Sequence, residues 1–179
     1  WYGRTKLLSE RSIETLAEDA FPAHQFLISN LYGHHTIDGQ RISKSVVINF
    51  FVDRAKAGEP LTVYEPGTQS RNFVHVVDVA RAFVRSAERL LEQLDAGETG
   101  TEKFEIATDE DPSVMAMAEL VADIAAREGE RPPIELVENP RGNETLVSDF
   151  AVDWSRAREE LGWKPNRTVE ETVEDLLAE

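Results

Sequence analysis

Residues 71–80 read RNFVHVVDVA, an apolar run that passes directly into a segment with helical periodicity. The run at residues 72–77 predicts a strand, and Asp78 is placed to cap a helix that extends to about residue 94. A strand that leads straight into a helix is the unit from which α/β proteins are built. The stretch therefore favours an α/β fold class.

The segments around this stretch continue the alternation of strands and helices. Apolar spacing predicts further helices at residues 6–20, 45–57, 112–126, 153–161 and 169–177. Short apolar runs bounded by turn residues predict further strands at residues 25–29, 61–64, 103–107 and 134–137. Residues 32–41 contain glycines and Asp38 and predict a loop. We assign to the apolar core the phenylalanines Phe50, Phe51, Phe73 and Phe83.

The overall composition is that of one acidic globular domain. The chain has 179 residues, 41% hydrophobic content and a net charge of −15. It can therefore bury a core, but it offers no basic footprint for a nucleic acid. No apolar run is long enough to cross a bilayer, and no basic-then-apolar leader is present. We accordingly expect a cytoplasmic protein that binds neither nucleic acid nor membrane.

The residues that hold metals or form disulfides are scarce. The cysteine count is zero, which excludes disulfides and thiolate metal sites. The histidines show no metal-binding spacing and stand at His24, His34, His35 and His75. We expect no metal site.

The charge pattern suggests a protein that works at high salt concentration. The 34 acidic residues are spread along the chain, whereas lysine occurs only at Lys6, Lys44, Lys56, Lys103 and Lys164. Dispersed acid with few lysines indicates a surface adapted to high salt, where screening removes self-repulsion. The alternative is an ordinary acidic cytoplasmic protein.

The first chemically suggestive pair is Tyr2 and Lys6. Residues four apart on a helix lie on the same face. A phenol titrates near pH 10, so it is a poor base unless a nearby cation favours its phenolate, and a lysine one turn away supplies that cation. The same spacing also arises by chance in many chains.

No glycine-rich phosphate-binding fingerprint accompanies this pair. The pattern G-x-G-x-x-G is absent, and Gly97 and Gly100 lie in an acidic loop. The chain begins at Trp1, inside an expected helix. We therefore expect a piece of a longer protein whose dinucleotide-binding element lies upstream.

Several further motifs follow in a fixed order along the chain. After Tyr2 and Lys6 come NLYG at residues 30–33, AGEPLTVY at residues 57–64, RNFVHVVDVA at residues 71–80, PRGN at residues 140–143 and REELGW at residues 158–163. Taken together they resemble the extended short-chain dehydrogenase/reductase family, that is, the NAD-dependent epimerase/dehydratases. The resemblance covers essentially the whole chain, and UDP-glucose 4-epimerases and nucleotide-sugar dehydratases are the most similar members.

The resemblance implies roles for particular residues. Tyr2 is similar to the family's catalytic base, and Lys6 to its partner, which also binds the ribose of NAD. Asn30 resembles the strand-end asparagine that binds the sugar diphosphate, with bracing of a loop as the alternative. Arg71 resembles the arginine that grips the diphosphate, since a guanidinium fork suits phosphate oxygens. A salt bridge is its alternative role.

Two more residues follow from the same resemblance. Arg141 is similar to a second arginine that contacts the nucleotide. Tyr64 is placed near the nucleotide base, with packing in the core as the alternative. The departures from the family pattern include His34, Glu65 and Asn72. They leave the subfamily open.

The resemblance also implies an architecture. The chain corresponds to the C-terminal part of a Rossmann-type fold, with remaining sheet strands plus a small mixed α/β substrate-binding domain. Residues 1–30 would end the dinucleotide-binding domain and residues 31–179 would mainly form the substrate-binding domain. A segment at about residues 71–95 would return to the Rossmann part.

The implied function is that of an NAD-dependent nucleotide-sugar epimerase acting at the sugar 4-position, with a homodimer as the expected assembly. A nucleotide-sugar 4,6-dehydratase or decarboxylase shares the same first step and stays open, as does the choice between NAD and NADP. A non-catalytic nucleotide-binding relative is a further alternative. A pure association module is another, because the helix after Tyr2 resembles the family's dimer-forming helix.

Overall fold

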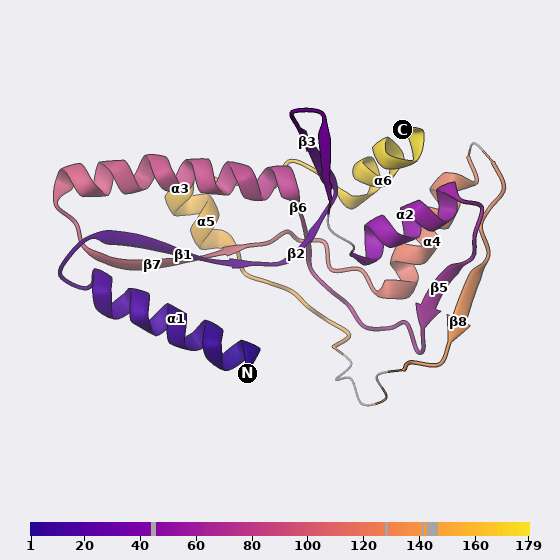
Figure 1. Ribbon diagram of the computed structural model, residues 1–179, viewed down its shortest axis with the longest axis horizontal. Coiled ribbons are helices and arrows are strands. Elements are labelled where there is room, and N and C mark those ends of the chain that lie inside the picture. Colours follow the sequence, from indigo (N-terminus) through magenta and orange to yellow (C-terminus); the bar gives the residue numbers. More distant parts are fainter. Residues whose placement is uncertain (44–45, 128, 141, 143–146) are drawn as a thin grey trace. The chain divides into compact units, whose positions relative to one another are not determined.

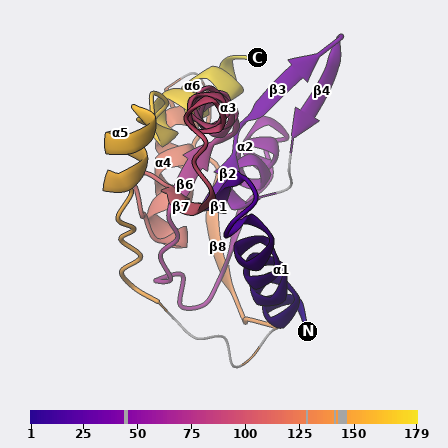
Figure 2. The ribbon, with the colours of Figure 1, turned by 90° about the vertical axis from the view of Figure 1, so that its left-hand side faces the viewer.

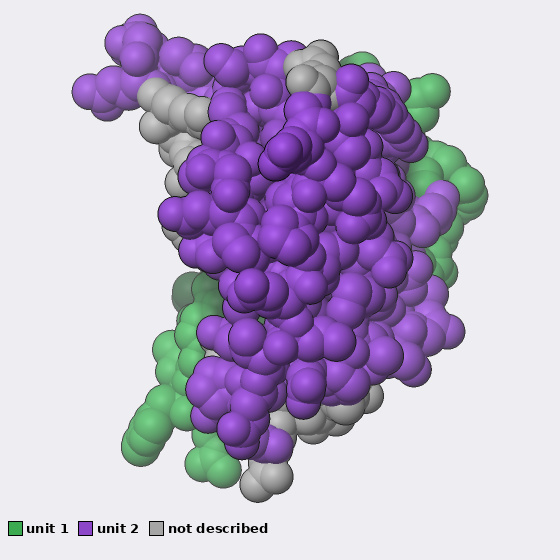
Figure 3. All heavy atoms as spheres, turned by 90° about the vertical axis from the view of Figure 1, so that its right-hand side faces the viewer, with its two compact units in different colours: residues 1–28, 79–106, 153–164 green, residues 29–78, 107–152, 165–179 purple. Residues whose placement is uncertain are grey.

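The computed structural model describes residues 1–43, 46–127, 129–140, 142 and 147–179. Helices alternate with strands along this part of the chain, which confirms the α/β fold class. The chain divides into two compact units, which Figure 3 colours separately. Unit 1 comprises Trp1–Ile28, Val79–Ile106 and Asp153–Lys164, and unit 2 comprises Ser29–Asp78, Ala107–Val152 and Pro165–Glu179.

Unit 1 is a two-stranded parallel sheet between helices. Its elements are α1 (Tyr2–Ala17), β1 (Pro22–Ile28), most of α3 (Val76–Ala96), β7 (Gly100–Ile106) and α5 (Ser155–Leu161). Strand β1 pairs with β7 in a register that runs from Pro22 opposite Gly100 to Ile28 opposite Ile106. Helix α1 lies on one side of this sheet and α3 on the other (Figure 1), and Figure 2 shows α5 on the side away from α1.

The alternation of side chains along β7 explains how both faces of this sheet are covered. Successive strand residues point to opposite faces. Lys103 faces α1, where its Nζ lies 2.6 Å from a carboxylate oxygen of Glu14. The preceding residue, Glu102, faces the other helices and accepts two hydrogen bonds of 2.9 Å from Arg89 on α3. One strand thus ties helices to both faces.

The same face holds a buried histidine. The ring of His24 on β1 lies 2.8 Å from Ser86 Oγ and 3.0 Å from Gln93 Oε1, both on α3. Burial lowers the pKa of His24, although Gln93 and Glu102 act in the opposite direction. The ring therefore serves unit 1 as a neutral polar link between strand and helix.

Unit 2 contains the remaining elements. They are β2 (Asn30–Tyr32), β3 (His34–Ile37), β4 (Gln40–Ser43), α2 (Val47–Lys56), β5 (Leu61–Tyr64), β6 (Phe73–His75), α4 (Val114–Ala125), β8 (Ile134–Val137) and α6 (Val169–Ala178). Strands β2 and β6 pair in parallel, as do β5 and β8, whereas β3 and β4 are antiparallel.

The core of unit 2 is a continuous apolar cluster. Helices α2, α4 and α6 contact one another, and α2 and α4 also contact β5. The buried members of the cluster are Tyr32, Ile48, Phe51, Val52, Leu61, Val63, Phe73, Met117, Ala118, Val121, Ala122, Ile124, Val169, Val173 and Leu176. The burial of so many large side chains supplies the main driving force for folding of this unit.

Polar side chains fix where two of these helices begin. Ser113 Oγ accepts a hydrogen bond of 3.1 Å from the N–H of Ala116 at the start of α4. Thr168 and Glu171 form a reciprocal capping box at the start of α6. Each cap satisfies backbone donors that a helix end otherwise leaves open, which is why both helices begin close to the predicted residue.

The prediction of a loop at residues 32–41 was wrong. Strands β3 and β4 form a hairpin there (Figure 2). Its turn consists of Asp38 and Gly39, with φ angles of 50° and 77°. Two successive positive φ values form the turn type that matches the twist of paired strands, and Asp-Gly is a favoured sequence for it. The Asp-Gly pair therefore signalled a hairpin.

The strand predicted at residues 72–77 is shorter than expected. Strand β6 ends at His75 and α3 begins at Val76. His75 Nδ1 accepts a hydrogen bond of 3.2 Å from the N–H of Val77, so it satisfies a donor of the first turn. Asp78 therefore lies inside the helix and does not cap it. Its carboxylate accepts 3.0 Å hydrogen bonds from the backbone of Asn166 and Arg167.

Two of the four phenylalanines assigned to the core are exposed. Phe51 and Phe73 are buried, whereas Phe50 and Phe83 are among the exposed large hydrophobic residues. Phe50 precedes Phe51 on α2, and neighbouring positions of a helix point in different directions. Within the residues that the structure describes, no helix is both long and apolar enough to span a membrane.

Candidate functional site

Tyr2 and Lys6 lie on the surface of unit 1. Both belong to the first turns of α1, and Tyr2 is 78% exposed. Lys6 Nζ lies 5.6 Å from the centroid of the Tyr2 ring, as expected for residues one helical turn apart. The ammonium group and the phenol are thus close and accessible from solvent. Their catalytic roles stay predictions.

Unit 2 contains a pocket of about 580 Å³. It lies where the start of α2, strand β5 and the segment before β6 meet. The lining residues are Asn30, Val46, Val47, Phe50, Phe51, Thr62, Tyr64, Gln69, Arg71, Phe73 and Val114. Three residues singled out in the sequence, Asn30, Tyr64 and Arg71, therefore line one pocket. Their roles in binding stay predictions.

Backbone pairing positions Asn30 at the pocket. Its Nδ2 and its backbone N–H both donate to the carbonyl of Asn72, each at 3.1 Å. The buried Asn72 side chain in turn donates to the Thr108 carbonyl at 2.6 Å and accepts from the Thr108 N–H at 3.2 Å. Asn30 is therefore attached to a rigid framework, while its own side chain stays exposed to solvent. The Asn72 network is a second support that the sequence did not reveal.

Arg71 supplies the cationic group of the pocket. Its Nη1 donates to the carbonyl of Ser70 at 2.8 Å. A guanidinium has five N–H donors in a planar fork, a geometry that suits carboxylate and phosphate oxygens. The side chain is half-buried, so an anion bound there would be only partly screened by water.

Tyr64 forms part of the pocket wall and does not lie in the core. It is 43% exposed at the end of β5. With Phe50 it offers aromatic surface to the pocket. Flat apolar surfaces beside a few polar groups are typical of sites for small organic ligands. Arg141 lies outside the described residues.

Gln69 is a pocket residue that our sequence analysis missed. It is 8% exposed, and its Oε1 has no hydrogen-bond partner among the described residues. Nothing in its local sequence marks Gln69 as a pocket residue.

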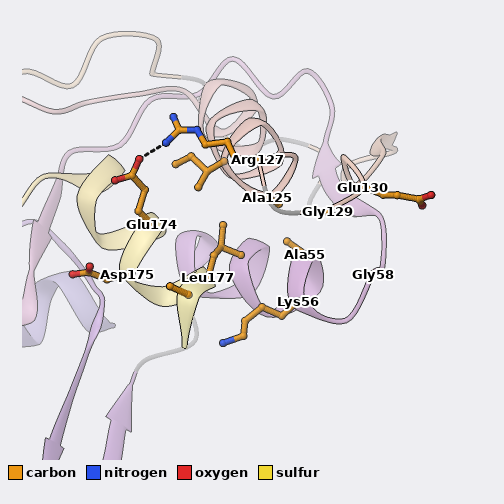
Figure 4. A pocket seen from close by; sticks show the side chains of 12 residues that line it. Ala55, Lys56, Gly58, Ala125, Arg127, Gly129, Glu130, Glu174, Asp175 and Leu177 are labelled. Carbon is orange, nitrogen blue, oxygen red and sulfur yellow. Dashed lines mark hydrogen bonds and ion pairs between the residues drawn. The ribbon is translucent and has the colours of Figure 1, made fainter.

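A second pocket of unit 2 contains none of the residues selected from the sequence (Figure 4). It measures about 560 Å³ and lies among the C-terminal ends of α2, α4 and α6. Arg127 on its wall forms an ion pair with Glu174, and also with Glu170 at 3.3 Å. Its cation is thus engaged by carboxylates of α6.

Comparison with known proteins gives a consistent picture. The model of the NAD dependent epimerase/dehydratase family matches residues 1–106. The dTDP-L-rhamnose 4-epimerase of Burkholderia thailandensis is 30% identical over 98% of this chain and 44% of its own length. UDP-glucuronic acid decarboxylase 6 of Arabidopsis thaliana is also 30% identical, over 90% of this chain and 43% of its own length.

Solved structures agree with the sequence comparisons. The UDP-glucose-4-epimerase of Stenotrophomonas maltophila, crystallised with NAD and formylated UDP-arabinopyranose, aligns with a TM-score of 0.71 at 26% identity. The alignment covers 99% of this chain and 53% of that protein. The chain thus spans about half the length of the relatives that it matches.

Proposed function

We propose that this chain, which belongs to the NAD dependent epimerase/dehydratase family, is the substrate-binding part of a nucleotide-sugar 4-epimerase. The reaction is an oxidation and re-reduction of the sugar at its 4-position, as in the interconversion of UDP-glucose and UDP-galactose. The observation that carries the proposal is the pocket of unit 2, where Asn30, Tyr64 and Arg71 meet from separate segments.

The pocket groups divide the binding of the nucleotide among them. Arg71 holds the diphosphate through its guanidinium fork, assisted by Arg141 and by the amide of Asn30. Tyr64 contacts the nucleotide base. Binding energy obtained at this end of the substrate positions the reacting carbon at the other.

Tyr2 and Lys6 carry the chemistry. Tyr2 takes the proton from the sugar hydroxyl, and Lys6 supplies the positive charge that favours the phenolate. Their exposed groups, one helical turn apart, also fit the ribose hydroxyls of a nicotinamide cofactor, which Lys6 would hold. When bound, that cofactor supplies the hydride acceptor. The glycine-rich element for its pyrophosphate is absent from this sequence, so we expect it from another part of the protein.

We also assign each unit to one of the expected domains. We assign the parallel β1–β7 sheet of unit 1 to the dinucleotide-binding domain and unit 2 to the substrate-binding domain. The proposed return of the chain to the first domain, at about residues 71–95, is supported by α3, which starts in unit 2 and continues in unit 1. We also propose a cytoplasmic homodimer that forms through α1, whose Leu8 and Leu16 are exposed.

A decarboxylase or a 4,6-dehydratase is the second candidate. The decarboxylase relative matches at the same 30% identity as the epimerase relative. All three reactions begin with oxidation at the same sugar position. The acid and base groups that distinguish these reactions would lie in the part of the protein that this chain does not span.

Titration with UDP tests the pocket assignment. Replacing Arg71 by Ala should weaken UDP binding by roughly 1.5–3 kcal/mol, the range for hydrogen bonds to a charged group. Isothermal calorimetry on the chain measures this loss. Arg85→Ala is the matched control, because Arg85 is exposed in unit 1 and pairs with Glu88 at 3.0 Å. Equal UDP affinity for wild type and Arg71→Ala would remove the diphosphate assignment.

A further inference from the structure

The backbone that leads to Arg71 is anchored by its own hydrogen bonds. The carbonyl of Gln69 accepts a hydrogen bond of 3.0 Å from the N–H of Val114. The N–H of Ser70 donates to the carbonyl of Val147 at 2.7 Å. These bonds precede Arg71 in the chain, so its position in the pocket is fixed by the residues before it.

The side chain of Asn30, by contrast, depends on a single backbone group. Its Nδ2 donates to the carbonyl of Asn72 at 3.1 Å, and this is its only hydrogen-bond partner among the described residues. A carbonyl can only accept, so the NH₂ end of the Asn30 amide faces Asn72. One N–H of that group is used there, which leaves the second N–H for an acceptor on a ligand. The position of the Asn72 carbonyl therefore sets the direction in which Asn30 can donate.

The side chain of Asn72 fixes the position of that carbonyl. Asn72 is fully buried, and its amide exchanges two hydrogen bonds with the backbone of Thr108, donating at 2.6 Å and accepting at 3.2 Å. Paired residues of neighbouring antiparallel strands exchange hydrogen bonds in the same way. Without the amide, an N–H and a carbonyl of Thr108 would be buried without these partners, and the backbone would shift to satisfy them. The Asn72 carbonyl would then move as well.

We infer that Asn72 is a positioning residue of the substrate pocket, which acts by directing the Asn30 amide and not by touching the ligand. Asn30 and Arg71 are among the described residues that line the pocket, whereas Asn72 is not. The inference rests on the proposed function, in which Asn30 and Arg71 bind the diphosphate. It predicts that ligand affinity depends on Asn72 through Asn30 and independently of Arg71.

A double-mutant cycle with UDP as the probe tests the inference. Measured by calorimetry, Asn72→Ala should weaken UDP binding about three- to tenfold, as for partners in one hydrogen-bond network. The same substitution in an Arg71→Ala chain should weaken UDP binding by the same factor. In an Asn30→Ala chain the factor should fall below about twofold, because the group that Asn72 directs is gone.

Thr172→Val is the matched control for a loss of stability. Thr172 is 4% exposed on α6, and its Oγ1 donates to the carbonyl of Thr168 at 2.8 Å. The variant thus also loses a buried side-chain hydrogen bond in unit 2. It should lower the melting temperature and leave the affinity for UDP unchanged. An equal loss of affinity in Thr172→Val would show that general loosening of the unit causes the effect, which overturns the inference.

The remaining outcomes separate the inference from the proposed function. An Asn72→Ala factor that is equal in the wild-type and Asn30→Ala chains, or no loss in Asn72→Ala at all, would overturn the inference and leave the assignment of Arg71 intact. Failure of the wild-type chain to bind UDP would overturn both proposals. If Asn72→Ala does not fold, Asn72→Ser, whose hydroxyl can make one of the two bonds, should show the same dependence on Asn30 with a smaller factor.

Discussion

Unit 2 has a closed core, whereas unit 1 exposes much of its apolar surface. The fifteen-residue cluster of unit 2 forms within its own boundaries. In unit 1, large apolar side chains are exposed on both α1 and α3, namely Leu7, Leu8, Ile13, Leu16, Phe83, Val84, Leu91 and Leu94. Parallel sheets normally have several strands and two covered faces, and the sheet of unit 1 has two described strands.

This difference bears on which proposed role can be studied in this chain. The described residues that line the pocket all belong to unit 2, so the pocket can be studied in this chain. Unit 1 carries Tyr2 and Lys6 on an exposed helix without the glycine-rich element of a cofactor site. The proposed binding residues thus lie in unit 2, and the proposed catalytic pair lies in unit 1.

The largest expected effect separates chemistry from binding. In a protein that joins this chain to the N-terminal half of its relatives, Tyr2→Phe should lower turnover by about 10²–10⁴-fold, the usual contribution of a general acid–base group. Binding of UDP-glucose should stay near the wild-type value, since the pocket lies in unit 2. Steady-state kinetics with titration of the substrate measures both. Turnover within a few-fold of wild type would show that Tyr2 is not the base.

Replacing a large apolar side chain by Ala should affect the stability of the two units very differently. Phe51 is 1% exposed in the core of unit 2, and its replacement by Ala should lower the free energy of unfolding by about 3–5 kcal/mol. At protein concentrations too low for the proposed homodimer to form, replacing Leu8, which is 68% exposed on α1, by Ala should cost less than about 0.5 kcal/mol of unfolding free energy. Urea denaturation followed by circular dichroism gives both values. A large cost for Leu8→Ala would mean that α1 is covered in solution, as a dimer would require.

Salt should stabilise both units if the acidic surface is an adaptation to brine. The net charge of −15 predicts a melting temperature that rises with KCl into the molar range, where the Debye length is about 3 Å. Tryptophan fluorescence follows unit 1 alone, because Trp1, Trp154 and Trp163 all belong to it. Circular dichroism follows both units. Melting curves that are flat from low to molar KCl would contradict the adaptation.

The smallest expected effect concerns pH. Glu102 in unit 1 and Glu110 in unit 2 should change the stability of the fold in opposite directions as the pH rises. In unit 1, hydrogen bonds from Arg89 hold the pKa of Glu102 below its usual 4.5. This group stabilises the fold above pH 4.5, and its contribution is lost as pH falls through the lowered pKa. In unit 2, burial raises the pKa of Glu110, despite a hydrogen bond from the Val169 N–H. Its contribution is present below pH 4.5 and is lost as pH rises through the raised pKa.

Melting curves of Glu102→Gln and Glu110→Gln between about pH 3.5 and 6.5 check these signs. The melting temperature of wild type relative to that of Glu102→Gln should increase with pH. Its melting temperature relative to that of Glu110→Gln should decrease with pH. Asp175→Asn, at an exposed ion pair with Arg167, is a control for the loss of one carboxylate. Two differences that change in the same direction would show that one of the environments is misassigned.

Local sequence patterns predicted much of the fold but less of the site. The helices at α2, α4 and α6 and the strands β5 and β8 follow from apolar spacing and turn residues, which act over short stretches of chain. The β3–β4 hairpin was missed because its strands are polar, so only the Asp38–Gly39 turn announced them. The exposure of Phe50 could not be predicted, since it depends on which helix face meets α4 and α6.

Predicting the residues of the site required information beyond local sequence patterns. Spacing alone predicted that Lys6 would lie beside Tyr2. Nothing in local physics brings Asn30, Tyr64 and Arg71 together, because their proximity is a product of tertiary packing, and only family resemblance selected them in advance. Gln69 stood out only once its burial and its missing partner were visible.

The register of the β1–β7 ladder has a consequence for synthesis on the ribosome. Strand β1 emerges first, yet every residue from Pro22 to Ile28 must wait for a partner between Gly100 and Ile106. At typical elongation rates this delay is on the order of ten seconds. During it the chain of unit 2, from Ser29 to Asp78, has already appeared. The nascent protein thus carries an unpaired apolar strand for much of its translation, and a chaperone or an upstream strand already made would be its natural protection.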